Sequence, residues 1–183
     1  MKKRIYNQTA LFGPLYAYLV VLSPPQPVKD AIAKIKKELN AITDISDRNL
    51  HSIAHITLID KLTDDTGFAG TVEGMVAGAR SFPVTIEGWN HFDHGHSVTL
   101  YLTVNNPVPI IELMSALKSP SRSPHISLAK KISHSDFHKL LPYLDSMDFK
   151  AEWMCTEINV LRKLMSEKHL GFRESFIISL QEH

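Results

Sequence analysis

The segment from Phe82 to Val104 constrains the fold of this 183-residue chain more than any other part of the sequence. Apolar residues alternate with polar or exposed positions on both sides of Asp93-His-Gly-His96, a stretch that suits a turn. The alternation predicts a long hairpin of two antiparallel strands. Strand-like apolar runs and amphipathic helical stretches are interspersed over the rest of the chain. Because hairpins are too frequent for a doubly wound parallel sheet, the predicted fold class is α+β.

The other elements follow from apolar periodicity and from proline and serine boundaries. Further strands are expected over residues 16–22, 52–59, 125–131, 151–162 and 172–180, and helices over residues 28–39 and 68–80, after Pro107 and after Ser133. Gly70, Gly74 and Gly78 lie four residues apart in the second helix, without the ending of a phosphate loop. Their expected use is close packing of that helix against the sheet.

The composition is that of an ordinary globular protein. Hydrophobic residues make up 44% and charged residues 21%, which excludes a wholly disordered or fibrous chain. Twenty Lys and Arg against 19 Asp and Glu give a net charge of +1, so there is no overall basic field. If RNA is a partner, a local site must bind it, and we expect no readout of DNA sequence.

The single cysteine, Cys155, cannot form an internal disulfide and fits a reducing compartment. Basic residues at positions 2–4 precede an apolar stretch, as in a signal peptide, but Gly13 and Pro14 interrupt it and no cleavage-site sequence follows. No apolar run approaches the roughly 18 residues that a membrane helix needs. We expect a cytoplasmic monomer without membrane contact, with residues 1–15 as a tail and residues 16–183 as one domain.

A short motif occurs twice, seventy positions apart, as His55-Ile-Thr-Leu58 and His125-Ile-Ser-Leu128. Each copy lies in a predicted strand, and strand side chains alternate between the two faces of a sheet. Each strand therefore offers an apolar face to a core and an imidazole with a hydroxyl to the other side. If the two strands lie side by side, two imidazoles and two hydroxyls converge on one cleft.

Two histidines suit the displacement of a phosphodiester without a metal. A neutral imidazole takes a proton from the attacking oxygen, and an imidazolium gives a proton to the leaving oxygen. Hydroxyls such as those of Thr57 and Ser127 can donate hydrogen bonds to the non-bridging oxygens, where negative charge concentrates in the transition state. The paired motif therefore predicts His55 and His125 as catalytic residues, and Thr57 and Ser127 as substrate-binding residues.

With these two motifs the sequence resembles the 2H phosphoesterase superfamily, and within it the bacterial 2′-5′ RNA ligase (LigT-like) family. The resemblance implies a bilobal α+β fold, with two pseudo-symmetric antiparallel sheets flanked by helices around a central cleft. It also implies hydrolysis of 2′,3′-cyclic phosphate ends of RNA or nucleotides without metal or cofactor, and in some members reversible 2′-5′ joining of RNA. Several relatives carry an arginine shortly after the second motif, where this chain has Lys130, which keeps the charge but loses the bidentate fork.

Three alternatives remain open from the sequence. His91, His94 and His96 lie close together near Asp93 and could hold zinc in a metal-dependent hydrolase. The chain could instead be a non-catalytic module of the same fold that binds RNA or a nucleotide. Lys130 could be a solvated strand residue without a role in substrate binding.

Overall fold

The computed structural model describes residues 13–167 and 171–182, so residues 1–12 of the expected tail lie outside the described residues. The strands are β1 (Tyr16–Leu22), β2 (Ile56–Thr63), β3 (Phe82–Asp93), β4 (Val98–Val104), β5 (His125–Ile132), β6 (Lys150–Cys155), β7 (Glu157–Leu164) and β8 (Glu174–Ser179). The helices are α1 (Gln26–Ile42), α2 (Asp47–Leu50), α3 (Phe68–Met75), α4 (Val108–Ala116) and α5 (His134–Ser146), with a 3-10 turn at Met165–Glu167.

These eight strands form one sheet in the order β6-β3-β4-β5-β2-β1-β7-β8, in which neighbouring strands pair antiparallel. The predicted α+β class and the antiparallel hairpin Phe82–Val104 are confirmed. In place of two separate sheets, two four-stranded halves meet at one residue pair, Ile56 of β2 with Ile126 of β5. The two copies of the motif therefore lie at the junction of the halves.

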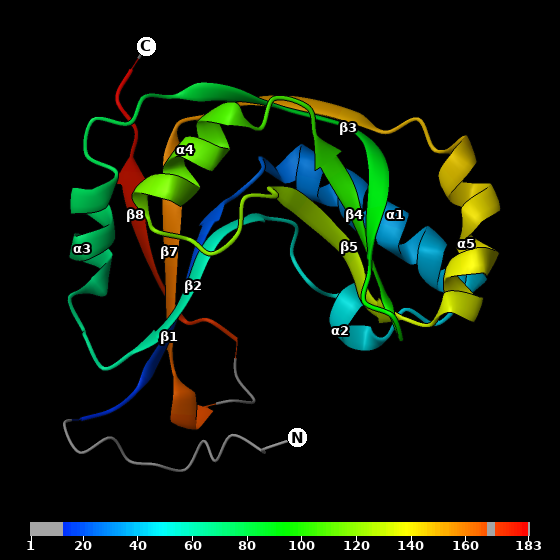
Figure 1. Cartoon of the computed structure of the whole chain (residues 1–183), viewed down its shortest axis with the longest axis horizontal. Coiled ribbons are helices and arrows are strands. Elements are labelled where there is room, and N and C mark those ends of the chain that lie inside the picture. The colour runs from blue at the N-terminus through cyan, green and yellow to red at the C-terminus, as the bar shows by residue number, and fades with distance from the viewer. Residues whose placement is uncertain (1–12, 168–170, 183) are drawn as a thin grey trace.

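The helices cover the two halves of the sheet separately (Figure 1). Helices α3 and α4 lie beside the half with β1, β2, β7 and β8, whereas α1 and α5 lie beside the other half. Buried apolar residues of α1 and α4 join those of the strands in one core cluster, among them Ile32, Leu39, Ile110 and Leu113. Since the core occupies the helix-covered face, half-buried polar side chains remain on the opposite face of β2 and β5.

Several local predictions are confirmed. Helix α1 follows a proline-rich exit from β1, with a proline in its first turn, where no backbone N–H is required. The Ser133 side chain accepts a hydrogen bond from the backbone N–H of Asp136 and caps α5 as predicted. None of the helices in the described ranges is long and apolar enough to cross a membrane.

Other local predictions are wrong. The strand expected over 151–162 is divided at Thr156 into β6 and β7, which pair with opposite ends of the sheet. Helix α3 ends at Met75, because Gly78 adopts a φ of 86°, which a right-handed helix does not contain. A Cβ atom added at Gly70, Gly74 or Gly78 would meet no atom within 4 Å, so these glycines do not serve close packing of the helix.

Candidate active site

The pairing of Ile56 with Ile126 determines on which face of the sheet the motif side chains lie. Both isoleucines are 0% exposed and belong to the core. Their neighbours in each strand therefore lie on the opposite face of the sheet. Extending the antiparallel register by one residue sets His55 across from Ser127, and Thr57 across from His125. The structure thus brings the four predicted residues together on one face, related by an approximate two-fold axis.

The two imidazoles are held in the same way. The Nδ1 atom of His55 lies 2.8 Å from the carbonyl oxygen of Ile53, and Nδ1 of His125 lies 2.8 Å from that of Ser123. Since a carbonyl oxygen only accepts hydrogen bonds, each ring donates its Nδ1–H, and Nε2 is left for proton exchange. His125 opens β5 as predicted, whereas His55 stands just before β2 rather than inside it.

A β-bulge in β5 brings Lys130 to the same face. Ser127 and Ala129 pair with consecutive residues of β4, so Leu128 is an extra residue in the ladder. Leu128 and Ala129 are accordingly both buried, and the alternation of side chains is reversed beyond them. Simple alternation from His125 would have pointed Lys130 into the core; the bulge instead points it toward the side of the histidines.

Strand β2 contains the matching bulge. Thr57 and Ile59 pair with consecutive residues of β1, which leaves Leu58 as the extra residue. The position equivalent to Lys130 is therefore Asp60, which is exposed. The halves thus differ in charge at one matched position, with an ammonium after the second motif and a carboxylate after the first. Alignment of the two motifs could have found Asp60, but only the register shows which way it faces.

Burial and surrounding positive charge lower the pKa of both histidines. For His55, burial is the largest cause; the hydrogen bond to Ile53 acts in the opposite direction, and the charges of Lys130, Lys36 and His125 lower the pKa further. For His125, burial again comes first, opposed by the hydrogen bond to Ser123 and assisted by Lys130. Lys130 therefore acts on both imidazoles, as a cation close to the pair must do.

Aromatic side chains that the sequence analysis did not identify lie next to His125. The rings of Phe92 and Tyr101 stack with their centroids 4.4 Å apart. The imidazole of His125 lies 5.3 Å from the Phe92 ring and 4.9 Å from the Tyr101 ring. Tyr101 pairs with Ser127, so the two residues share a face of the sheet. In the sequence, Tyr101 stands between the apolar residues Leu100 and Leu102 of a predicted strand. This alternation could have indicated that the Tyr101 side chain lies on the face opposite the core.

The hairpin histidines do not converge. The ring of His91 lies 4.7 Å from that of Phe137, and His94 Nε2 is 3.0 Å from Thr99 Oγ1. The Asp93 carboxylate is 3.1 Å from Nε2 of His134. Within residues 13–167 and 171–182, no three His, Cys, Asp or Glu side chains are grouped so that they could hold a metal ion. The zinc alternative therefore has no ligand set in this part of the chain.

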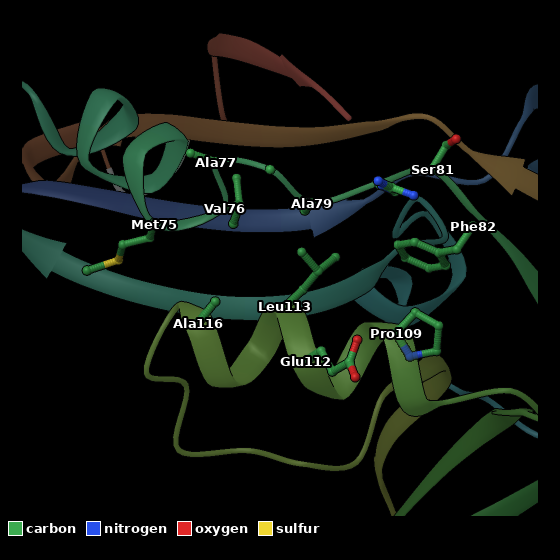
Figure 2. Close-up of a pocket in the computed structure, with 12 residues that line it drawn as sticks. Met75, Val76, Ala77, Ala79, Ser81, Phe82, Pro109, Glu112, Leu113 and Ala116 are labelled. Carbon is green, nitrogen blue, oxygen red and sulfur yellow. The ribbon is translucent and has the colours of Figure 1, made fainter. Parts of the chain in front are cut away.

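The pocket in Figure 2 lies away from the motif histidines. It has a volume of about 510 Å³ and is formed by residues 75–82 and by α4. Leu113 and Pro109 of α4 face Val76, Ala79 and Phe82 across it (Figure 2), so its walls are largely apolar. A second pocket of about 440 Å³ lies between residues 23–29 and 153–157. Neither of these two pockets includes His55 or His125.

The fold and the paired motif define a 2H phosphoesterase of the LigT-like kind. The chain matches the family model described as the 2′-5′ RNA ligase superfamily over residues 24–166, and it therefore belongs to that family. This membership supports a function of the phosphoesterase or RNA ligase type. No protein with a curated description matches the chain.

Solved structures show the same fold at low sequence identity. E. coli LigT complexed with 3′-AMP is 13% identical, with a TM-score of 0.54 and coverage of 91% of this chain and 95% of LigT. TT0787 of Thermus thermophilus is 13% identical, with a TM-score of 0.55 and coverage of 88% and 97%. Kluyveromyces marxianus Usb1 with uridine monophosphate is 13% identical, with a TM-score of 0.51 and coverage of 90% and 98%.

Proposed function

We propose that the protein is a metal-independent phosphodiesterase that opens 2′,3′-cyclic phosphate ends of RNA or of nucleotides. The observation that carries the proposal is the matched pair of imidazoles across the junction of Ile56 and Ile126. Each is tied through Nδ1 to a backbone carbonyl 2.8 Å away. Two Nε2 atoms on one face supply the base and the acid that an in-line displacement at phosphorus requires.

In the proposed reaction a water oxygen attacks phosphorus, and one imidazole takes the proton that the water loses. The bond from phosphorus to one ribose oxygen breaks, and the other imidazole, as imidazolium, protonates that oxygen. The product is a phosphomonoester with a free neighbouring hydroxyl. If a 5′-hydroxyl of RNA replaces water and the 3′-oxygen leaves, the same proton transfers form a 2′-5′ bond. We therefore propose reversible 2′-5′ joining of RNA as a second activity of the same site.

Thr57, Ser127 and Lys130 would bind the phosphate. The two hydroxyls lie across the junction from the opposite histidines, so both can reach non-bridging oxygens of a phosphate between the imidazoles. Lys130 adds a full positive charge near both histidines. The stacked rings of Phe92 and Tyr101 beside His125 offer a base an apolar surface for stacking. The 3′-AMP bound to E. coli LigT and the uridine monophosphate bound to Usb1 support a nucleotide ligand.

Purified protein, dialysed extensively against EDTA, should be incubated with the four nucleoside 2′,3′-cyclic phosphates and with RNA that ends in a cyclic phosphate. The proposal expects conversion to 2′- or 3′-monophosphates, lost in His55→Ala and in His125→Ala and retained in His96→Ala, a change at an exposed hairpin histidine. Binding of the nucleotide without turnover would instead identify a non-catalytic binding module. Loss of activity on dialysis with recovery on addition of zinc would contradict the metal-independent reaction.

A further inference from the structure

We infer that Lys36 is a positioning residue that makes the two motif histidines unequal, so that His55 serves as the base and His125 as the acid. This inference rests on the proposed function, because it assigns roles within the ring-opening step. The paired motif itself is nearly symmetric and provides no reason to prefer either histidine. The difference between the histidines comes from their surroundings.

Lys36 is a buried cation. Its side chain projects from α1, and the residue is 1% exposed. Its Nζ atom donates hydrogen bonds to the carbonyl oxygen and to the hydroxyl oxygen of Ser52, both at 2.7 Å. The Ser52 hydroxyl in turn donates to the carbonyl oxygen of Asn49 at 2.9 Å, so it accepts from the ammonium. The ammonium is therefore held by neutral acceptors, and its charge is not cancelled by a carboxylate at these contacts.

Ser52, which accepts the hydrogen bonds from Lys36, belongs to the segment that orients His55. Ser52 directly precedes Ile53, whose carbonyl oxygen accepts the Nδ1–H of the His55 ring. Asn49 ties the same segment to β5, because its side chain accepts from the N–H of Lys130 at 3.0 Å and donates to the carbonyl of Lys130 at 2.9 Å. Lys36 and Lys130 are thus both connected to the loop that carries His55.

The segment before His125 is held differently. The guanidinium of Arg122 donates to the carbonyl oxygens of Ser119 and Ser121, within the same loop. Arg122 itself is exposed and is not among the charges that act on His125. A buried ammonium thus lies behind the first motif, whereas an exposed guanidinium closes the loop before the second.

The charged groups around the two imidazoles differ accordingly. Lys130 and Lys36 both act on His55, whereas only Lys130 of these two lysines acts on His125. The repulsion between the two imidazoles is mutual and favours neither of them. Asp60, the carboxylate at the matched position of β2, is not among the charges that act on either imidazole. A nearby like charge disfavours protonation. When the pair holds one proton, that proton therefore resides on His125, and its charge further opposes protonation of His55. A neutral His55 with a charged His125 is the state in which His55 accepts a proton and His125 donates one.

The inference is tested by titrating the histidine ring resonances of the wild-type protein by NMR, which requires no turnover. We expect His55 to titrate at a lower pH than His125. In Lys36→Met the titration of His55 should move up by roughly half a pH unit or more, and the acidic limb of the kcat/KM profile should move with it. The basic limb should stay in place. Lys37→Met, an exposed neighbour on α1, should move neither limb.

Titration of His125 below His55 in the wild-type protein would overturn the assignment, even if Lys36→Met fails to fold. Movement of the basic limb instead of the acidic limb would overturn it as well, as would an unchanged His55 in a folded Lys36→Met. An inactive protein whose histidines titrate in the expected order would contradict the proposed function while leaving the charge asymmetry intact.

Discussion

Ile56 of β2 pairs with Ile126 of β5, and within the eight described strands this is the one residue pair that joins the two halves of the sheet. Because both side chains are buried in the core, the residues on either side of each isoleucine lie on the other face. The pairing of β2 with β5 therefore determines the relative position of His55 and His125.

Loss of either histidine should remove one of two coupled proton transfers. We expect His55→Ala and His125→Ala each to lower turnover of a 2′,3′-cyclic nucleotide by about 10²-fold or more. Since the residues act as a unit, the double variant should lose little beyond the worse single variant. Steady-state kinetics on the four proteins of this cycle measure the coupling. Strictly multiplicative losses would mean that the histidines do not share a site.

The hydroxyls of Thr57 and Ser127 should contribute to the transition state and little to folding. Thr57→Val keeps the β-branched shape, and Ser127→Ala removes only the second hydroxyl. Each should cost roughly 2–4 kcal/mol of transition-state stabilisation, and the free energy of unfolding should change by less than about 1 kcal/mol. Turnover and the urea midpoint should be measured on the same preparations. A lower midpoint with unchanged turnover per folded molecule would assign both hydroxyls to the fold.

Lys130 should act on phosphate and on both imidazoles. We expect Lys130→Ala to raise KM by about tenfold and to raise the pKa of both histidines, because its charge lowers both. Lys61→Ala is the matched control, since Lys61 is the exposed lysine that follows Asp60 in β2. Kinetics and NMR titration of the two variants check the prediction. Equal effects of the two substitutions would assign Lys130 to the solvated surface.

The pH optimum should lie on the acidic side of the ordinary imidazole range. The base must be neutral and the acid charged, so kcat/KM should rise and then fall with increasing pH. Because burial and positive charge lower the pKa of both His55 and His125 from 6.5, both limbs should shift down. The maximum of kcat/KM is therefore expected below about pH 6.5. A maximum above about pH 7.5 would contradict a lowered pKa at both histidines.

The buried ammonium of Lys36 should make stability depend on pH in the alkaline range. Burial, together with the charge of Lys130, lowers the pKa of Lys36 from 10.5 to about 8 in the folded protein. Between these values the unfolded chain binds more protons, so the free energy of unfolding should rise with pH. Relative to Lys36→Met, the gain should approach about 3 kcal/mol by pH 10.5. Urea unfolding of both proteins at pH 7 and pH 10 measures the difference, and parallel curves would contradict it.

The sequence predicted well those parts of the fold that depend on local pattern. Alternation identified the hairpin Phe82–Val104, and apolar periodicity identified α1, because each pattern has only one face that can be buried. Prediction from the sequence failed where a single residue interrupts such a pattern. The interruption at Thr156 divides two strands within a stretch that reads as a single strand, and the positive φ of Gly78 lies in a stretch whose composition still favours helix.

The candidate site shows the same limit. The motif residues were identified because two copies agree at matched positions. Lys36 could not be identified in this way, because it lies on a helix far away in the chain and its lysine neighbours are solvated. The orientation of Lys130 depends on the bulge at Leu128, which contradicts simple alternation. A bulge arises from pairing with a particular neighbouring strand, and no local sequence pattern determines that pairing.

The most direct test of the central claim is ³¹P NMR of 2′,3′-cyclic AMP incubated with the wild-type protein and with the His55→Ala, His125→Ala double variant. The proposed mechanism predicts that the wild-type protein replaces the cyclic phosphate resonance with that of a monophosphate, while the double variant at equal concentration leaves it unchanged. Conversion at the same rate by both proteins would show that the paired histidines are not the acid and base. An unchanged cyclic resonance with folded wild-type protein would contradict the proposed activity on this nucleotide.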